Sequence, residues 1–477
     1  AEPHVGFALE LVQADALARY HRLLGQDVRF QTGTDENALK NVLAAEANRS
    51  SVQDWVDRHS QRFGALCRTL GCSEDDFIRT TEERHHRAVH RLWRSLKAGD
   101  VYRKGFTGLY CTGCEDFYVS EDLRNGVCPE HGTAPVEVTE ENYFFRLSSY
   151  QDRLGELIAG NALRVIPETR KNEVLSFIER GLRDISISRS ATRARGWGVS
   201  VPDDPSQVVY VWIDALTNYI AGLGFGDGGE AWRRHWHPHS TVTHVIGKNV
   251  WKFHAIYWPA LLLSAGLPLP DEVLVHGFLT VNGRKIGKSL GNAVDPFGCI
   301  DIYGTDAVRY YLLRAIPPFD DGDFAADRLG QLYAADLADG LGNLLSRLTA
   351  LCQRAEYGSH PWEGTPDAPP GYHAAIGERE FAKALAALWQ VIGRINVDIQ
   401  RQRPWEALKL GRLDAVHGCL REWLKVFGGV VYWLAPFLPD ASQRALTALR
   451  CSPITAAPPL FPRLEAASGG VTGLRWP

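Results

Sequence analysis

The sequence predicts an α/β protein, in which a parallel sheet is split by a small zinc-knuckle insertion and followed by an α-helical bundle. Three observations predict this order. Strand-like and helix-like patterns alternate through most of residues 1–305. A short, strand-rich stretch at 108–145 carries two paired metal-ligand motifs. From residue 333 onward, alanine and leucine recur at helical spacing.

The first elements are expected to be a helix, a strand and further helices. Apolar residues at helical spacing predict a helix over 8–24. The run 28–30 is predicted to be a short strand, and 32–35 the turn that follows it. Residues 51–100 read as helical with polar faces. Strand and helix therefore alternate here, as in a parallel α/β sheet.

Alternation resumes after the insertion. The apolar runs 208–213, 243–246 and 273–276 are predicted to be buried strands. Four helices are expected over 333–357, 378–402, 411–434 and 438–450, with a loop at 358–371. The predicted domains are the first half of the α/β domain (1–107), the insertion (108–145), the second half (146–305) with a lysine loop at 285–289, a connecting stem region (306–332), the helical bundle (333–465) and a tail (466–477).

Composition excludes several classes of protein. The chain of 477 residues has 45% hydrophobic and 23% charged residues, which is typical of a soluble globular protein. A net charge of −4 provides no overall basic field for nucleic acid. No apolar run is long enough to span a membrane, and no signal peptide is visible. Cysteines outside the paired motifs are scattered singly, which predicts a reducing cytoplasm.

The chain contains no methionine and opens inside its first motif. We therefore expect that the sequence is not a primary translation product and that a leading segment precedes it.

The paired motifs predict a metal site. Cys111 and Cys114 form C-x2-C, and Cys128 and His131 form C-x2-H after thirteen intervening residues, 115–127. Three thiolates and an imidazole favour zinc in a tetrahedral site. Four protein ligands leave no open position, so a structural role is expected. The alternative is that these residues are incidental, one of them simply buried.

Two short motifs predict a phosphate site. The first motif, Pro3-His4-Val5-Gly6-Phe7, falls where a strand is expected to turn into a helix. Gly6 has no side chain, so a nucleotide can approach the backbone there. The N-terminus of the helix that follows can bind the phosphates. His4 can donate to phosphate oxygens. Lys285-Ile286-Gly287-Lys288-Ser289 is expected to be a lysine loop that neutralises developing negative charge. A lysine pair with a serine is, taken alone, more often a solvated loop.

These motifs resemble the H-I-G-H and K-M-S-K-S signatures of class I aminoacyl-tRNA synthetases, and the whole chain resembles the methionyl-tRNA synthetase family. Further matching segments are 33–36, 77–81, 141–148, 210–215, 244–248, 253–259, 276–279 and 289–292. The resemblance implies a class I synthetase Rossmann-type sheet and an anticodon-binding-like helical bundle. It also implies an enzyme that uses Mg2+-ATP to convert an amino acid into aminoacyl-AMP, with structural Zn2+.

The resemblance also implies roles for individual residues. The expected catalytic residues are His4, Lys285 and Lys288. ATP would contact His4, Gly6, Phe7, Gly247, Asn249, Lys285, Lys288 and Ser289. The amino acid would contact Asp35, Val211, Trp212, Ala215, Tyr219, Val250 and His254. Asn343, Arg347 and Trp405 fall where the family reads its anticodon. The alternative is that Trp212 and Tyr219 are ordinary core aromatics and that Trp405 serves packing.

Four positions depart from the family pattern. Phe7 replaces the second histidine of the first signature, Asn37 replaces a histidine, and Asn249 replaces an aspartate. Ile286-Gly287 replaces Met-Ser in the lysine loop, a milder change. The segment between Arg189 and Trp197 is also longer and more basic than the family pattern.

Three hypotheses follow from these departures. The first is a ligase that passes the acyl group to a small hydroxylamine-type acceptor. The methionyl-tRNA-synthetase-like domains of hydrazine synthetases act in this way, and a cupin domain then aids N–N bond formation. On this hypothesis, a cupin domain is expected upstream of the sequence. The second is a methionyl-tRNA synthetase that charges tRNA. The third is an inactive binding protein, against which the retained His4 and lysines argue.

Overall fold

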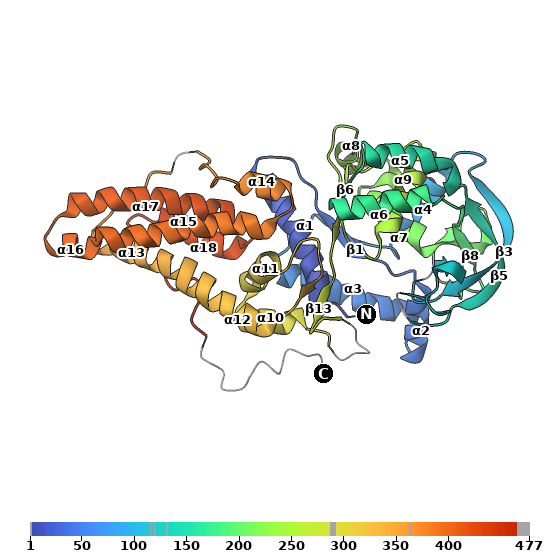
Figure 1. Ribbon diagram of the computed structural model, residues 1–477, viewed down its shortest axis with the longest axis horizontal. Helices are drawn as coiled ribbons and strands as arrows, with labels where there is room; N and C mark the ends of the chain where they lie inside the picture. Colours follow the sequence, from blue (N-terminus) through green and yellow to red (C-terminus); the bar gives the residue numbers. More distant parts are fainter. Residues whose placement is uncertain are drawn as a thin grey trace. The chain divides into compact units, whose positions relative to one another are not determined.

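The computed structural model describes residues 2–114, 116–118, 120–129, 132–286, 292–362 and 364–464. The chain forms two compact units (Figure 1). Unit 1 contains Ala1–Glu2, Arg29–Ala65 and Glu74–His276, and unit 2 contains Pro3–Val28, Leu66–Ser73 and Gly277–Pro477. These units do not coincide with the domain boundaries predicted above, which remain a prediction.

Parallel strands form the centre of unit 1. Strand β12 (Glu272–His276) lies between β11 (Thr243–Gly247) and β6 (Arg164–Ile166) and is parallel to both. Every residue of β12 is buried, as expected for a strand covered on both faces. Strands β1 (Gln31–Thr34) and β2 (Asp76–Arg79) form a second parallel pair. The predicted parallel α/β fold is therefore confirmed.

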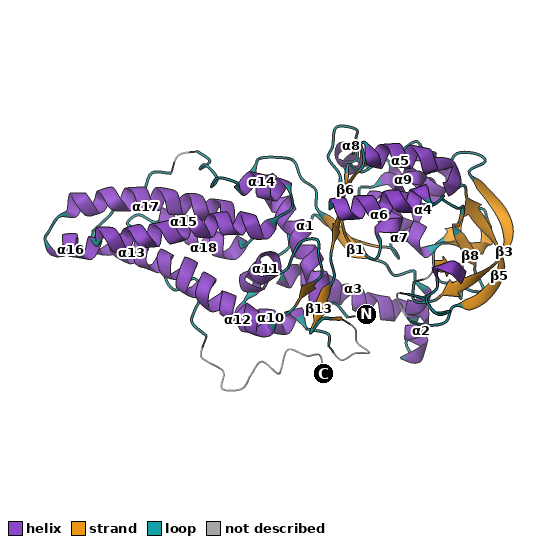
Figure 2. Ribbon diagram, viewed as in Figure 1, coloured by secondary structure: helices purple, strands orange, loops and turns teal. Residues whose placement is uncertain are grey.

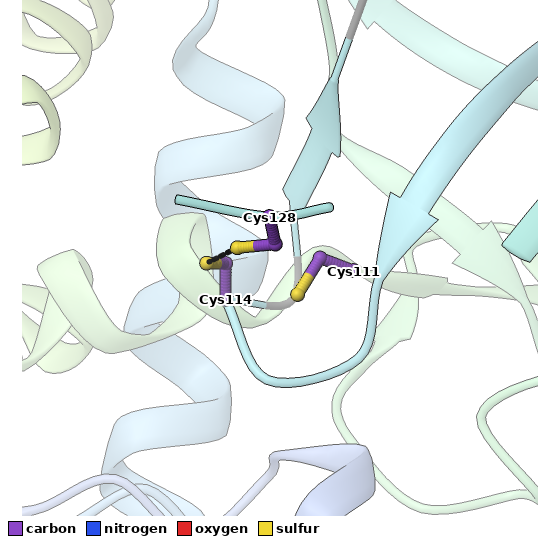
Figure 3. Close-up of side chains that lie close together, drawn as sticks. All are labelled: Cys111, Cys114 and Cys128. Carbon is purple, nitrogen blue, oxygen red and sulfur yellow. Dashed lines mark hydrogen bonds between the residues drawn. The ribbon is translucent and has the colours of Figure 1, made fainter. Parts of the chain in front are cut away.

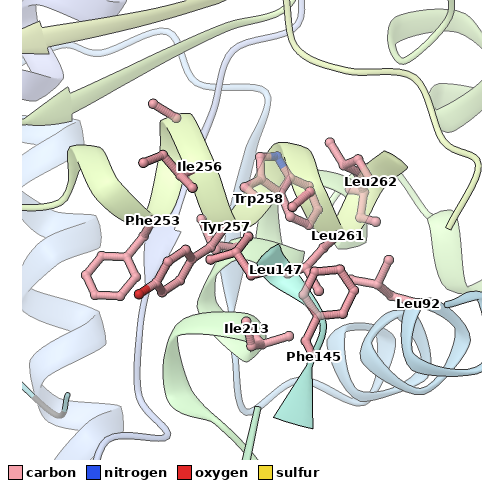
Figure 4. Packing of buried hydrophobic residues seen from close by; sticks show 14 of the residues in the cluster. Leu92, Phe145, Leu147, Ile213, Phe253, Ile256, Tyr257, Trp258, Leu261 and Leu262 are labelled. Carbon is pink, nitrogen blue, oxygen red and sulfur yellow. The ribbon is translucent and has the colours of Figure 1, made fainter. Parts of the chain in front are cut away.

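Helices and short helical turns surround these strands. The α-helices of unit 1 are α2 (Leu39–Ala47), α3 (Val52–Thr69), α4 (Glu83–Ser95), α5 (Gln151–Ala159), α6 (Glu168–Glu179), α7 (Val211–Ala221), α8 (Glu230–His235) and α9 (Trp258–Ser264). The short turns are η1 (Ser120–Asp122), η2 (Leu147–Tyr150), η3 (Phe225–Asp227) and the π-helical η4 (Phe253–Tyr257). Figure 4 shows the core, in which side chains of η4 and α9 meet residues of α4, β5 and α7.

An antiparallel sheet carries the predicted insertion (Figure 2). Its strands lie in the order β4 (Asp116–Tyr118), β3 (Val101–Cys111), β5 (Val136–Phe145) and β7 (Ile185–Ser186). A neighbouring sheet has the order β8 (Ser188–Ser190), β10 (Asp204–Val209) and β9 (Ser200–Val201), also antiparallel.

Unit 2 is mainly helical. Helices α13, α15, α17 and α18 pack together, and Figure 1 shows α15 and α17 running side by side. The helices are α1 (Val5–Leu23), α10 (Pro296–Tyr303), α11 (Thr305–Arg314), α12 (Ala326–Leu332), the π-helical η6 (Tyr333–Gly342), α13 (Asn343–Arg354), α14 (Tyr372–Gly377), α15 (Phe381–Gln402), α16 (Pro404–Lys409), α17 (Leu413–Leu434) and α18 (Pro439–Arg450). A small sheet has the order β14 (Arg284–Lys285), β13 (Leu279–Val281) and β15 (Gly322–Asp323).

Four element predictions were wrong in detail. The strand predicted at 28–30 begins instead at Gln31, where the ladder to β2 starts. The Phe30 N–H donates to the Asp75 side-chain carboxylate at 2.7 Å, and the Phe30 carbonyl accepts from the Asp75 N–H. The expected turn at 32–35 is therefore mostly strand. The region 51–100 is not continuously helical, because β2 interrupts it.

The fourth correction concerns the apolar run 208–213. It ends as a strand at Val209 and continues as α7 from Val211, and its strand, β10, is antiparallel. A short apolar run does not distinguish a buried strand from the first turn of a buried helix.

Candidate amino-acid and nucleotide site

One face of α7 carries the predicted amino-acid pocket in unit 1. Val211, Ala215 and Tyr219 follow at intervals of four residues, which places them on one side of the helix. The neighbouring Trp212 lies flat against Phe253, with ring centroids 3.9 Å apart and planes 8° apart. Phe253 was not predicted; it belongs to η4, and only the fold brings it to α7.

The hydroxyl of Tyr219 is hydrogen-bonded to His254, another residue of the predicted pocket. Nδ1–H of His254 donates to the Val250 carbonyl oxygen at 2.9 Å, which leaves Nε2 to accept from the Tyr219 hydroxyl at 2.6 Å. The Tyr219 ring also lies 4.0 Å from the His244 ring. Burial holds the pKa of His244 well below its usual range, so this ring is neutral. These neutral aromatic groups suit an apolar or thioether side chain.

The predicted ammonium ligand is Asp35. It follows β1, and its side chain is accessible to solvent although protein surrounds it. This surrounding protein raises the pKa of the carboxyl to about 6, with a further contribution from the negative charge of Asp214. The carboxylate is therefore ionised at neutral pH and can pair with an ammonium group.

The turn that follows Asp35 is held by buried polar contacts. Arg79 donates to both carboxylate oxygens of Glu36, at 2.8 and 3.0 Å. The hydroxyl of Thr80 accepts from the Glu36 backbone N–H at 2.8 Å. Both Glu36 and Thr80 are buried, so these hydrogen bonds leave little freedom to the backbone beside Asp35.

Asn37 enters a second buried network. Its side-chain N–H donates to Asp214 Oδ2 at 2.8 Å, and His85 Nε2–H donates to Asp214 Oδ1 at 2.6 Å. His85 and Asp214 are almost fully buried. The sequence marked Asn37 only as a departure from the family pattern; its partner Asp214 lies far along the chain and was not predicted.

The first signature motif lies in unit 2, at the start of α1. Nδ1 of His4 accepts from the Gly6 N–H at 3.1 Å and so caps the helix. Burial lowers the pKa of His4 to about 4, so the ring is neutral and its Nε2–H is the donor. A Cβ on residue 6 would lie 2.8 Å from the His4 ring, which explains the glycine. The Phe7 ring lies 4.6 Å from that of His4.

The other predicted nucleotide ligands are divided between the units. Gly247 ends β11 in unit 1, and Asn249 lies two residues further on. A Cβ added to Gly247 would lie 3.2 Å from the Oδ1 atom of Asn249, so the two residues are closely packed. In unit 2, Lys285 ends β14. Lys288 and Ser289 lie outside the described residues, as does Gly287.

Three of the predicted zinc ligands come together in unit 1 (Figure 3). The ligand atoms of Cys111, Cys114 and Cys128 all lie within 4.8 Å of one another. The Tyr118 hydroxyl lies 3.1 Å from Cys114 Sγ. A compact group of soft sulfur donors fits zinc. His131, the predicted fourth ligand, lies outside the described residues.

The anticodon-like residues lie on two helices of unit 2 that contact each other. Asn343 and Arg347 belong to α13, and Trp405 belongs to α16. Arg347 donates to Asn396 Oδ1 at 2.9 Å, so α15 contributes a neighbour that the sequence did not suggest. Burial lowers the pKa of Arg347 from its usual value.

The fold is that of a class I aminoacyl-tRNA synthetase. The family description "tRNA synthetases class I (M)" matches residues 1–135 and 114–349. The methionine–tRNA ligase of Thermotoga maritima is 40% identical over 463 residues, which cover 93% of this chain and 72% of that protein. The corresponding ligase of Brucella suis is 38% identical and covers 94% of this chain and 89% of its own length.

A solved structure of a related enzyme agrees with these sequence comparisons. The methionyl-tRNA synthetase of Mycobacterium tuberculosis, bound by methionyl-adenylate, superposes with a TM-score of 0.87 at 37% identity and covers 97% of each chain. The chain belongs to the methionyl-tRNA synthetase family. The resemblance seen in the sequence is thereby confirmed, and with it an enzyme that forms amino-acid adenylates with ATP.

These relatives are all methionine–tRNA ligases, so they support the second hypothesis above better than the first. They give no support to a hydrazine-synthetase activity, a hydroxylamine acceptor or a cupin partner. Among the described residues, no helix is long and apolar enough to cross a membrane.

Proposed function

We propose that this chain activates methionine with Mg2+-ATP and transfers the methionyl group to tRNA. The observation that carries the proposal is the neutral aromatic pocket in which Trp212 stacks on Phe253 and Tyr219 bonds to His254. Such a slot is complementary to an unbranched thioether and offers no charge to attract a polar side chain. The chain's relatives support the same substrate and acceptor.

In the proposed reaction, the Asp35 carboxylate binds the amino-acid ammonium, and the substrate carboxylate attacks the α-phosphorus of ATP. The bond to pyrophosphate breaks, and pyrophosphate leaves with the electron pair. Positioning and charge neutralisation carry such a step without a protein nucleophile. We assign His4 Nε2–H, Lys285 and Lys288 to the phosphates, together with the backbone at Gly6 and the residues Gly247, Asn249 and Ser289.

We further assign zinc to Cys111, Cys114, Cys128 and His131. Zinc would supply structural cross-linking of the insertion rather than chemistry. The cysteines in the described part of the chain are free thiols, and we propose a reducing cytoplasm as the compartment that keeps them so. Asn343, Arg347 and Trp405 are the proposed anticodon contacts.

A second candidate function keeps the adenylation step but changes the acceptor to a small hydroxylamine-type amine. The observation that favours it is Phe7, which stands against His4 where a second donor is expected. Loss of such a donor costs about a hundredfold in rate. A slow enzyme of this kind suits biosynthesis of a small molecule better than the supply of charged tRNA.

Two assays test these proposals together. The first measures methionine-dependent exchange of labelled pyrophosphate into ATP, and absence of exchange with every amino acid would leave only an inactive binding protein. The second presents the adenylate with tRNA or with N6-hydroxylysine. Methionyl-tRNA as the product supports our proposal, whereas acylated hydroxylysine without charged tRNA would replace it with the second candidate.

A further inference from the structure

The basic segment that the sequence analysis singled out forms a compact loop in unit 1. We call residues 190–197 the arginine loop. Within it, Gly196 N–H donates to the Ala191 carbonyl at 2.9 Å, and Arg195 N–H donates to the Thr192 carbonyl at 3.1 Å. Arg195 and Gly196 have φ values of 54° and 71°. The backbone hydrogen bonds and the left-handed conformation of Arg195 and Gly196 therefore hold the arginine loop in one compact turn.

One side of the arginine loop is anchored to the cysteine-containing sheet. Arg193 pairs with Glu140 of β5 at 3.2 Å, and only 16% of the Arg193 side chain is exposed. Its guanidinium lies 3.8 Å from the centroid of the Tyr110 ring on β3. Ser190 also donates to Glu140, at 2.9 Å. A shielded ion pair combined with a cation–π contact makes this a firm attachment.

The other side reaches the turn that carries Asp35. The indole N–H of Trp197 donates to the Glu36 carbonyl oxygen at 2.9 Å. Arg195 forms an ion pair with Glu46 of α2, the helix that follows this turn. Asn41 donates to the same Glu36 oxygen at 2.9 Å, so Trp197 is one of two donors to it.

We propose that Trp197 is a positioning residue for Asp35, held in place by the arginine loop. The Glu36 side chain and its N–H are fixed by Arg79 and Thr80, as described above. The Trp197 hydrogen bond to the Glu36 carbonyl restrains the Glu36–Asn37 peptide, one peptide beyond Asp35. This restraint acts on the turn from Asp35, the proposed ammonium ligand, to Asn37, which itself donates to Asp214. The inference rests on the proposed function, because it assumes that Asp35 binds an amino-acid ammonium.

The test is the variant Trp197→Phe, which removes the N–H and keeps an aromatic ring. One hydrogen bond to a backbone carbonyl is worth about 1 kcal/mol, so we expect the dissociation constant for L-methionine to rise about fivefold. The dissociation constant for ATP should not change. Trp433→Phe is the matched control, because its indole donates to the Pro366 carbonyl at 2.8 Å within the helical bundle of unit 2.

Two methionine analogues separate positioning from a general structural effect. L-Methioninol keeps the ammonium group, so Trp197→Phe should weaken its binding as much as that of methionine. 4-(Methylthio)butanoate lacks the ammonium group, so its affinity should be unchanged. Equal losses for both analogues, or no loss for either, would overturn the proposal.

A second variant tests the attachment of the arginine loop without changing Trp197 itself. Arg193→Lys keeps the charge beside Glu140 but loses the planar stack on Tyr110, so a smaller loss confined to ammonium-bearing ligands is expected. If the unaltered protein binds neither methionine nor methioninol, the proposed function fails and this inference fails with it. If it binds both and the variants bind them equally well, only the inference fails.

Discussion

The indole N–H of Trp212 donates to the carbonyl oxygen of Cys114 at 3.2 Å. Trp212 belongs to the amino-acid pocket that we propose, and Cys114 belongs to the thiol group that we assign to zinc. The turn at Cys114 and the proposed pocket are therefore neighbours within unit 1, and the Trp212 ring is tied to the conformation of that turn.

Removal of zinc should loosen the amino-acid pocket. Without a metal ion to hold Cys111, Cys114 and Cys128 together, the carbonyl that orients Trp212 gains freedom. We expect chelation to weaken L-methionine binding several-fold and to shift tryptophan fluorescence. Titration calorimetry before and after chelation, with zinc added back, measures the effect. Cys451→Ala, at an exposed cysteine of unit 2, is the control variant. Unchanged affinity for methionine after zinc removal would contradict the expectation.

Tyr219→Phe should weaken binding of methionine. The change leaves Nε2 of the buried His254 without the hydroxyl that lies 2.6 Å away. An unsatisfied buried acceptor costs about 1–3 kcal/mol, so we expect the KM for methionine in pyrophosphate exchange to rise about fivefold or more. Tyr372→Phe removes a buried hydroxyl that donates to the Trp433 carbonyl at 2.6 Å in unit 2, and it should leave this KM unchanged.

Amino-acid affinity should depend on the protonation of Asp35. Its pKa is raised to about 6, so the carboxyl becomes neutral as the pH falls through that value. Below it, we expect affinity for methionine to fall about tenfold per pH unit. His4, with a pKa near 4, stays neutral over this range and adds no inflection. Calorimetry across the range measures the profile. Asp35→Asn should bind weakly and without this dependence; a profile that survives the substitution would assign the titration elsewhere.

Phe7→His should accelerate adenylation. A histidine here would restore the second donor of the signature, and one such donor is worth up to about a hundredfold in rate. The rate of pyrophosphate exchange at saturating substrates measures the gain. Phe7→Leu, which supplies no donor, is the matched control. An equal rate in Phe7→His and Phe7→Leu would mean that the lack of a hydrogen-bond donor at position 7 does not limit the reaction.

Arg309→Met should destabilise unit 2. Arg309 is fully buried, lies 2.7 Å from the buried Asp15 of α1, and donates to the carbonyl oxygens of Leu70, Pro436 and Phe437. Removing one partner of a buried pair costs about 3–5 kcal/mol, which denaturant unfolding should reveal. Arg401→Ala, at an exposed pair with Asp398, should change stability by about 0.5 kcal/mol or less. Similar losses for both variants would contradict this account.

Local chemistry explains which parts of the structure were predictable. The cysteine pairs, the glycine after His4 and the apolar periodicity of α15 and α17 each act over a few residues, so the sequence displays them directly. The start of β1 and the change from strand to helix after Val209 were missed. Both depend on hydrogen bonds to segments distant in the chain, and composition does not record such partners.

The sequence by itself determined the class of chemistry, because each signature motif is a short contiguous segment whose resemblance to a known family can be read directly. Tertiary structure alone decided their surroundings. It placed Phe253 against Trp212, Asp214 beside Asn37, and the indole of Trp197 against Glu36. Each of these contacts joins residues from separate elements. The physical reason is that stacking and hydrogen bonding act over a few ångströms in space, whatever the separation in sequence.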